Sequence, residues 1–220
     1  MKSLFLLLPG LLLAAPAIAQ NAGAAGDERL GPREILPRDH EIALARSAAP
    51  ASVSGEATVW AFTEDGYRVA VEGTNGVACY VGRSWPRSIE PHCHDAEGAD
   101  TIMRIHMREG EMMHRGVPRE EMDRRIGQAI LAGELRLPSR PAMSWMMSSA
   151  QELISDEGRA VGAWRPHLMI YYPYLSAEDT GLTGTPDLRH AVLVSPGHAT
   201  SNFMIVVEEA IDPVWSTPGD

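Results

Sequence analysis

Two helical stretches joined at a glycine lie in the middle of the chain, between segments that read as strands. In the first stretch, apolar and small residues recur at the spacing of one helical face from Ala99 to Met113. Gly116 ends it, and Pro118 suits the first turn of a second helix, which ends at Gly133. Strand-like segments on both sides predict an α+β fold, with a mainly antiparallel sheet and a two-helix block inserted between strands.

The segments before this block read as a three-stranded meander. Residues 58–63 alternate moderately between apolar and polar side chains, and the Asp-Gly pair at 65–66 is a strong hairpin signal. Residues 67–71 return as a second strand. The turn formers at 73–76 then lead to a third strand over residues 77–81.

The remaining segments complete a single domain. A short helix is expected from Asp39 to about Ala48. Four strand-like runs follow the helical block, at residues 142–147, 167–172, 191–194 and 203–207. Residues 20–38 are rich in glycine, alanine and charge, which predicts an extended leader. We therefore expect one globular domain over residues 39–220.

The N-terminus has the layout of a cleavable secretory signal. Lys2 is followed by an apolar run over residues 4–13 and by an Ala-Ile-Ala cleavage site at 17–19. The apolar run is shorter than the roughly 20 residues that a membrane-spanning helix needs, and a proline and a glycine interrupt it. We predict a signal peptide over residues 1–19 and a mature chain that begins at Gln20. The protein is then periplasmic or secreted, with no membrane insertion after cleavage.

The charge of the chain excludes one class of partner. The 220 residues carry a formal net charge of −10, and loss of the single lysine in the signal peptide takes this to −11. Such a chain repels phosphate backbones, and nucleic-acid binding needs a basic patch that the sequence lacks. Hydrophobic residues make up 45% of the chain, which excludes a disordered protein. The expected partner is a small molecule or a protein, and no cofactor is predicted.

The chain has two cysteines, Cys79 and Cys93. An even number in an exported protein predicts a disulfide, worth about 3 kcal/mol for a loop of this length. The two Cα atoms should then lie about 4.4–6.8 Å apart. The alternative is a nucleophilic Cys93 activated by His92 or His94, and the oxidising compartment favours the disulfide.

The same short segment holds the densest group of metal-ligand types. On an extended strand His92 and His94 point to one side, and Asp95 or Glu97 would complete a ligand set for Zn or Cu. Two histidines separated by one residue are a weak motif, so we favour a solvated loop beside a disulfide and expect no bound metal. The eleven methionines also suit copper, but at helical and strand spacing they are more typical of core packing.

One C-terminal strand carries the candidate pocket residues. His167 shares a strand face with Met169 and Tyr171, and Trp164 is near in sequence. An apolar wall with a few polar tips is typical of small-molecule pockets. The same pattern describes a strand at the rim of the core, and this interpretation is favoured. His106, on the apolar face of the first central helix, is typical of a buried core histidine.

Several stretches together resemble a family of exported bacterial proteins of unknown function. They are SAAPASV at 47–53, GTNGVAC at 73–79, DAEG at 95–98, residues 133–137 and 141–148, and PHLMIYYPYL at 166–175. The resemblance spans most of the mature chain and implies export. It implies no activity, cofactor or catalytic residue.

Three classes of function remain open from the sequence. A non-enzymatic envelope domain that binds a small ligand or a partner is favoured, because no catalytic motif is present. The second class is a Zn- or Cu-binding protein of the periplasm. The third is a hydrolase with an unrecognised site, since the chain contains serines and histidines but lacks the G-x-S-x-G elbow.

Overall fold

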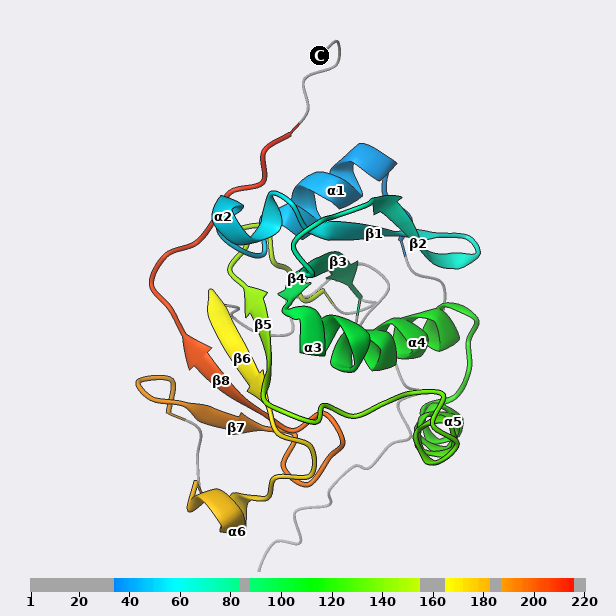
Figure 1. Cartoon of the computed structure of the whole chain (residues 1–220), viewed down its shortest axis with the longest axis vertical. Coiled ribbons are helices and arrows are strands. Elements are labelled where there is room, and N and C mark those ends of the chain that lie inside the picture. The colour runs from blue at the N-terminus through cyan, green and yellow to red at the C-terminus, as the bar shows by residue number, and fades with distance from the viewer. Residues whose placement is uncertain (1–33, 84–87, 155–164, 183–186, 216–220) are drawn as a thin grey trace, which may run out of the picture.

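One eight-stranded sheet forms the centre of the computed structural model, which describes residues 34–83, 88–154, 165–182 and 187–215. The strands are β1 Thr58–Thr63, β2 Gly66–Val71, β3 Ala78–Gly82, β4 Glu90–His94, β5 Ala142–Met146, β6 His167–Tyr171, β7 Val192–Val194 and β8 Asn202–Val206. Their order in the sheet is β2-β1-β3-β4-β5-β6-β8-β7 (Figure 1). Neighbouring strands are antiparallel except β1 and β3, so the predicted α+β fold with a mainly antiparallel sheet is confirmed.

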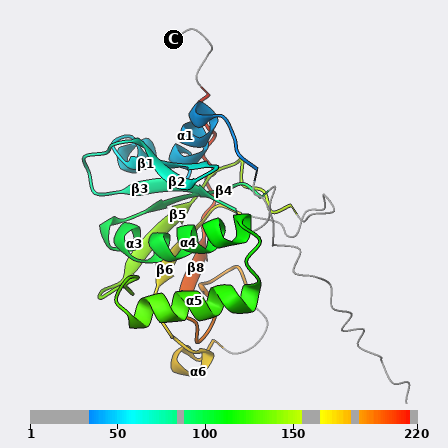
Figure 2. The ribbon, with the colours of Figure 1, turned by 90° about the vertical axis from the view of Figure 1, so that its right-hand side faces the viewer.

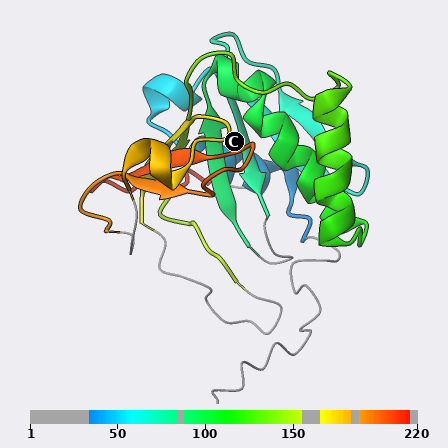
Figure 3. The same cartoon turned by 90° about the horizontal axis from the view of Figure 1, so that it is seen from below.

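The helices are α1 Arg38–Arg46, α2 Ala51–Ser54, α3 Ala96–Asp100, α4 Ile102–His114, α5 Arg119–Leu131 and α6 Ala177–Thr180. Three of them, α3 to α5, lie between β4 and β5 in the chain, where we expected two. Thr101 separates α3 from α4 because its backbone is not helical, with φ −127° and ψ −87°. Figures 2 and 3 show α4 and α5 side by side on the same side of the sheet. In the described part of the chain, no helix combines the length and apolarity needed to cross a membrane.

The expected meander is only half correct. β1 and β2 form the predicted antiparallel hairpin across the Asp-Gly turn. β3, however, pairs in parallel with β1 rather than with β2. After β2 the chain crosses close to the start of β1, and a side chain at Gly73 would place its Cβ only 2.1 Å from the backbone nitrogen of Thr58. The glycine that we interpreted as part of a hairpin turn instead permits this close crossing.

The predicted disulfide lies on the face of the sheet that α1 covers. Cys79 and Cys93 are directly opposite each other on β3 and β4 and are bonded to each other. Their Cα atoms are 4.0 Å apart, which is shorter than the expected window, so the bond is confirmed but the expected separation is not. Both residues are fully buried and pack in one cluster with Leu44 and Ala45 of α1.

The opposite face of the same strands is covered by α3 and α4. Alternation along β3 and β4 places Tyr80, His92 and His94 on this face. Tyr80 packs in one cluster with Met103 and Met107 of α4. The imidazoles of β4 are therefore directed between the sheet and α4.

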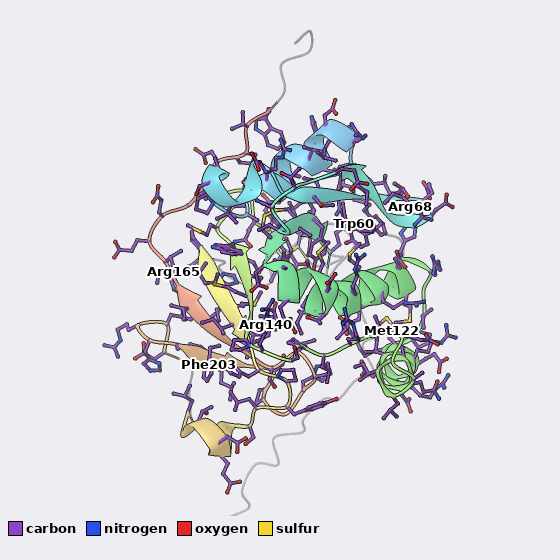
Figure 4. All side chains as sticks on the ribbon, viewed as in Figure 1. Trp60, Arg68, Met122, Arg140, Arg165 and Phe203 are labelled. Atoms are coloured by element: carbon purple, nitrogen blue, oxygen red, sulfur yellow. A yellow bond between two sulfur atoms is a disulfide. The ribbon has the colours of Figure 1, made fainter. Side chains whose placement is uncertain are left out.

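Methionines fill the core, as the sequence predicts. Met122 on α5, labelled in Figure 4, packs with Met112 and Met113 of α4. Met146 and Met169 pack in a further cluster on β5 and β6. The four C-terminal strands also begin and end within one residue of the predicted positions.

A buried ion pair connects α1 to the end of β3. The Arg83 guanidinium donates to the Glu41 carboxylate, and both side chains are almost completely buried. Burial raises the pKa of the Glu41 carboxyl above its ordinary value, while the Arg83 charge and hydrogen bond lower it.

The outer edge of β2 is occupied by side chains from two helices. The backbone N–H of Tyr67 donates to Glu111 of α4, with an N–O distance of 3.1 Å. The guanidinium of Arg38, at the start of α1, donates to the carbonyl of Ala70. The other edge of the sheet is the three-residue strand β7.

Candidate functional site

Aromatic and imidazole rings stack along the face of β3 and β4 that lies under α4. Tyr80 is directly opposite His92, and their ring centroids are 5.2 Å apart with nearly parallel planes. His92 and His94 lie on one face of β4, as their spacing predicts, with centroids 5.7 Å apart and an interplanar angle of 4°. The sheet register alone therefore creates a row of three stacked rings.

Two further rings close this row. His106 projects from α4, and its ring centroid lies 6.3 Å from that of His92 and 6.2 Å from that of Tyr171 on β6. The Tyr171 ring is also 6.1 Å from His94. We call these five residues (Tyr80, His92, His94, His106 and Tyr171) the ring cluster. It draws on β3, β4, α4 and β6.

Burial keeps the imidazoles of the cluster neutral. It lowers the pKa of His94 from 6.5 to about 3, with a smaller contribution from His106. Burial likewise lowers the pKa of His106 to about 4, followed by the effect of His198. The pKa of His92 is also well below its ordinary value, through burial first and then through the neighbouring histidines. Near pH 7 each ring is an uncharged donor and acceptor.

Three ring nitrogens of the cluster have no hydrogen-bond partner among the described residues. They are Nδ1 of His92 and both nitrogens of His94. His94 is completely buried and His92 almost so, so the solvated loop favoured for this segment is wrong: it is the buried strand β4. Buried polar atoms are normally hydrogen-bonded, because leaving one unpaired costs free energy. Such a group of nitrogens favours a role beyond packing.

A cavity of about 170 Å³ adjoins one end of the cluster, between the sheet and α4. Residues of β3 and β4 form one side of the cavity, and residues of α4 form the other. It is lined by Tyr80, Gly82, Arg83, Glu90, His92, His106, Glu109, Gly110 and Met113. Two imidazoles, two carboxyl groups and a phenol ring therefore face one small space.

The charges around this cavity favour a cation. Burial raises the pKa of Glu109 from 4.5 to about 7, although Arg119 lowers it, and Asp123 raises it further. Glu109 is therefore close to half ionised at neutral pH. The guanidinium of Arg83 also lines the cavity, but its charge is neutralised by Glu41.

The metal ligands considered from the sequence are not brought together. The Asp95 carboxylate accepts a hydrogen bond of 2.8 Å from the backbone N–H of Gly98 and caps α3. Glu97 accepts from Ser139 and Arg140 instead. Within the ranges that the structure describes, no group of three or more His, Cys, Asp or Glu side chains is arranged to hold a metal ion.

The predicted pocket residues separate in space. Tyr171 belongs to the ring cluster, whereas His167 begins the same strand four residues earlier, opposite Met146 of β5, and is outside the cluster although it contributes to the low pKa of His92. His167 is buried, and its Nδ1 lies 2.6 Å from the carbonyl oxygen of Arg165. Trp164 lies outside the described residues.

Sequence reasoning missed three residues of the site, Tyr80, Glu90 and Glu109. Tyr80 follows Cys79, so a disulfide between directly opposed strands would have placed it against His92. Glu109 follows His106 by three residues, a spacing that puts both on one helical face. Both signals were present in the sequence, but each needed a strand register or a helix orientation that composition does not supply.

Comparison of the chain with protein-family models, with curated proteins and with solved structures found no match. The resemblance to a family of exported proteins stays a prediction from the residues. The geometry of the ring cluster and its cavity carries the functional inference that follows.

Proposed function

We propose that this chain is an exported, non-enzymatic binding domain whose ligand is a small organic cation held in the cavity beside the ring cluster. One observation carries this proposal. The carboxyl groups of Glu90 and Glu109 and the neutral imidazoles of His92 and His106 line the same cavity, while the only guanidinium among the described lining residues is already paired. These groups accept hydrogen bonds and favour positive charge.

The size of the cavity limits the ligand to a few heavy atoms. Pockets for drug-sized molecules occupy about 300–1,000 Å³, whereas this cavity has about 170 Å³. A liquid water molecule takes about 30 Å³, so the space suits a methylguanidinium or a short alkylammonium ion. The Tyr80 ring also lines this space, and an aromatic ring beside a cation adds a favourable cation–π contact.

The chemistry of the lining favours binding over hydrolysis. None of the described residues that line the cavity is a serine, threonine or cysteine. A nucleophilic mechanism of the kind used by serine and cysteine hydrolases needs such a group next to a base. The imidazoles here face carboxyl groups and a tyrosine instead.

Calorimetric titration with methylguanidinium and propylammonium tests the proposal, with propionate as the anionic probe of similar size. Both cations should bind and propionate should not. Affinity for the cations should rise from pH 6 to pH 8, because Glu109 loses its proton across its pKa of about 7. Glu109→Gln should weaken cation binding and remove this pH dependence.

A second variant separates loss of the site from loss of the fold. Gly110 lies in α4 and lines the cavity, and a Cβ there would meet the Tyr67 ring at an ordinary 3.6 Å. Gly110→Ala should weaken binding while stabilising the helix by about 0.5–1 kcal/mol. Gly127→Ala on α5, where a Cβ meets nothing within 4 Å, should stabilise the protein and leave binding unchanged. The proposal would be refuted if wild type, Gly110→Ala and Gly127→Ala bound the cations equally well, or if the wild type bound no cation at pH 8.

Zn or Cu binding is the second candidate function, and the unpaired nitrogens of His92 and His94 favour it. Neutral imidazoles are the form that ligates these metals. A third donor would have to move into place, since none is positioned within the described ranges. We expect no metal to survive dialysis against a weak chelator. If the dialysed protein kept about one Zn or Cu per chain, and His94→Leu lost it, metal binding would become the favoured function.

A further inference from the structure

A groove lies on the opposite side of the sheet from the ring cluster, between α1, α2 and the C-terminal segment. Its volume is about 400 Å³, within the range of small-molecule pockets. The SAAPASV stretch, residues 47–53, forms the turn between the two helices and most of α2. The groove is lined by Asp39, Ile42, Ala43, Arg46, Ser47, Ala49, Ala51, Ser54, Gly55, Ile211, Asp212 and Val214.

The serine hydroxyls of this groove have hydrogen-bond partners, whereas one arginine nitrogen has none within the described ranges. The Ser47 hydroxyl donates to the carbonyl of Leu44, and the Ser54 hydroxyl donates to the carbonyl of Ala49. Arg46 is different, because its Nε is buried without a hydrogen-bond partner among the described residues. A buried guanidinium nitrogen without a partner is costly and favours an anionic ligand.

The two carboxylates of the groove do not satisfy Arg46. Asp39 is exposed, and its nearest ion-pair partner is Arg38 at 3.9 Å. Asp212, also exposed, accepts a hydrogen bond from the Ser149 hydroxyl. Solvent screens such exposed charges, while the half-buried Arg46 is screened less. Neither carboxylate therefore pairs with Arg46, whose Nε remains without a hydrogen-bond partner among the described residues.

We propose that this groove binds an apolar molecule with a single carboxylate, such as a medium-chain acyl anion. Ile42, Ile211 and Val214 supply the apolar wall for the acyl chain. The guanidinium of Arg46, which lines the groove, donates to the ligand carboxylate, and its planar fork suits two parallel hydrogen bonds. The site is independent of the ring cluster, since it lies on the face of the sheet that α1 covers.

Calorimetric titration with octanoate tests the site, and octanol and octylammonium are the matched neutral and cationic probes. Octanoate should bind at least tenfold more tightly than either, because its carboxylate gives the buried Nε of Arg46 a charge-assisted partner. Arg46→Gln should reduce octanoate affinity by at least tenfold and leave octanol binding unchanged. Arg68→Gln, a change to an exposed arginine on β2, should leave octanoate binding as in the wild type.

A blocking variant keeps the test independent of Arg46. Ala51 is exposed at the start of α2 and lines the groove, so Ala51→Trp should fill it without disturbing the core. It should abolish binding of octanoate and octanol together, with an unchanged urea midpoint. Octanoate that binds no better than octanol, or that binds Ala51→Trp as well as the wild type, would overturn the proposal.

Discussion

Replacing His94 by leucine should make the protein less sensitive to acid. The His94 pKa is about 3 in the folded protein against 6.5 ordinarily, so the unfolded chain binds a proton first as the pH falls. Stability from this group is complete above pH 6.5 and is lost progressively down to about pH 3. One pKa unit is worth about 1.4 kcal/mol, which gives a loss of about 2 kcal/mol at pH 5. His94→Leu has a similar volume and does not titrate, so it should escape this loss.

Urea unfolding at pH 8, 6 and 5, with a chelator present, measures the effect. The free energies of unfolding of His94→Leu and wild type should be similar at pH 8, and the variant should be about 2 kcal/mol more stable at pH 5 relative to that baseline. His106 stays in the variant and also has a lowered pKa, so some acid sensitivity remains. His190→Gln, a change to an exposed histidine before β7, is the control and should follow the wild type. If His94→Leu and wild type lose stability in parallel, the burial of a neutral imidazole is not the cause.

Three further results are expected. Reducing the Cys79–Cys93 bond should lower the free energy of unfolding by about 3 kcal/mol in urea titrations, and thiol titration of the unreduced, denatured protein should find no free sulfhydryl. Glu41→Gln should cost about 3–5 kcal/mol by leaving Arg83 unpaired, whereas the double variant Glu41→Leu with Arg83→Met should recover most of this loss. Protein recovered from the periplasm or medium should have an intact mass that starts at Gln20, and retention of the first methionine would contradict export.

Local patterns predicted the elements of this fold better than their pairing. The Asp-Gly turn fixed the β1–β2 hairpin, because such a turn determines both partner and register. The turn after β2 did not reveal the partner of the next strand. Its glycine, Gly73, is needed for a close crossing of two backbone segments and not for a hairpin turn. The disulfide could be predicted from the even number of cysteines together with the expectation of export. The parallel pairing of β1 and β3 could not, because it depends on contacts between segments distant in sequence.

The candidate site follows the same division. The common direction of His92 and His94 comes from strand alternation, which is local. Their contacts with His106 and Tyr171 depend on how α4 lies across the sheet. Residue spacing in the sequence does not predict this orientation. Asp95 was considered as a ligand in the less favoured metal interpretation, but its carboxylate caps the start of α3.

The side chains at the edge of β2 determine how this protein can meet other chains. An exposed sheet edge is a template on which another strand can pair, and proteins commonly block it. Here Glu111 and Arg38 occupy backbone groups that an incoming strand would use. At the other edge, β7 offers only three residues. A partner of this protein is therefore expected to bind through side chains on its helices and loops, and a concentrated solution should resist growth of the sheet from one molecule to the next.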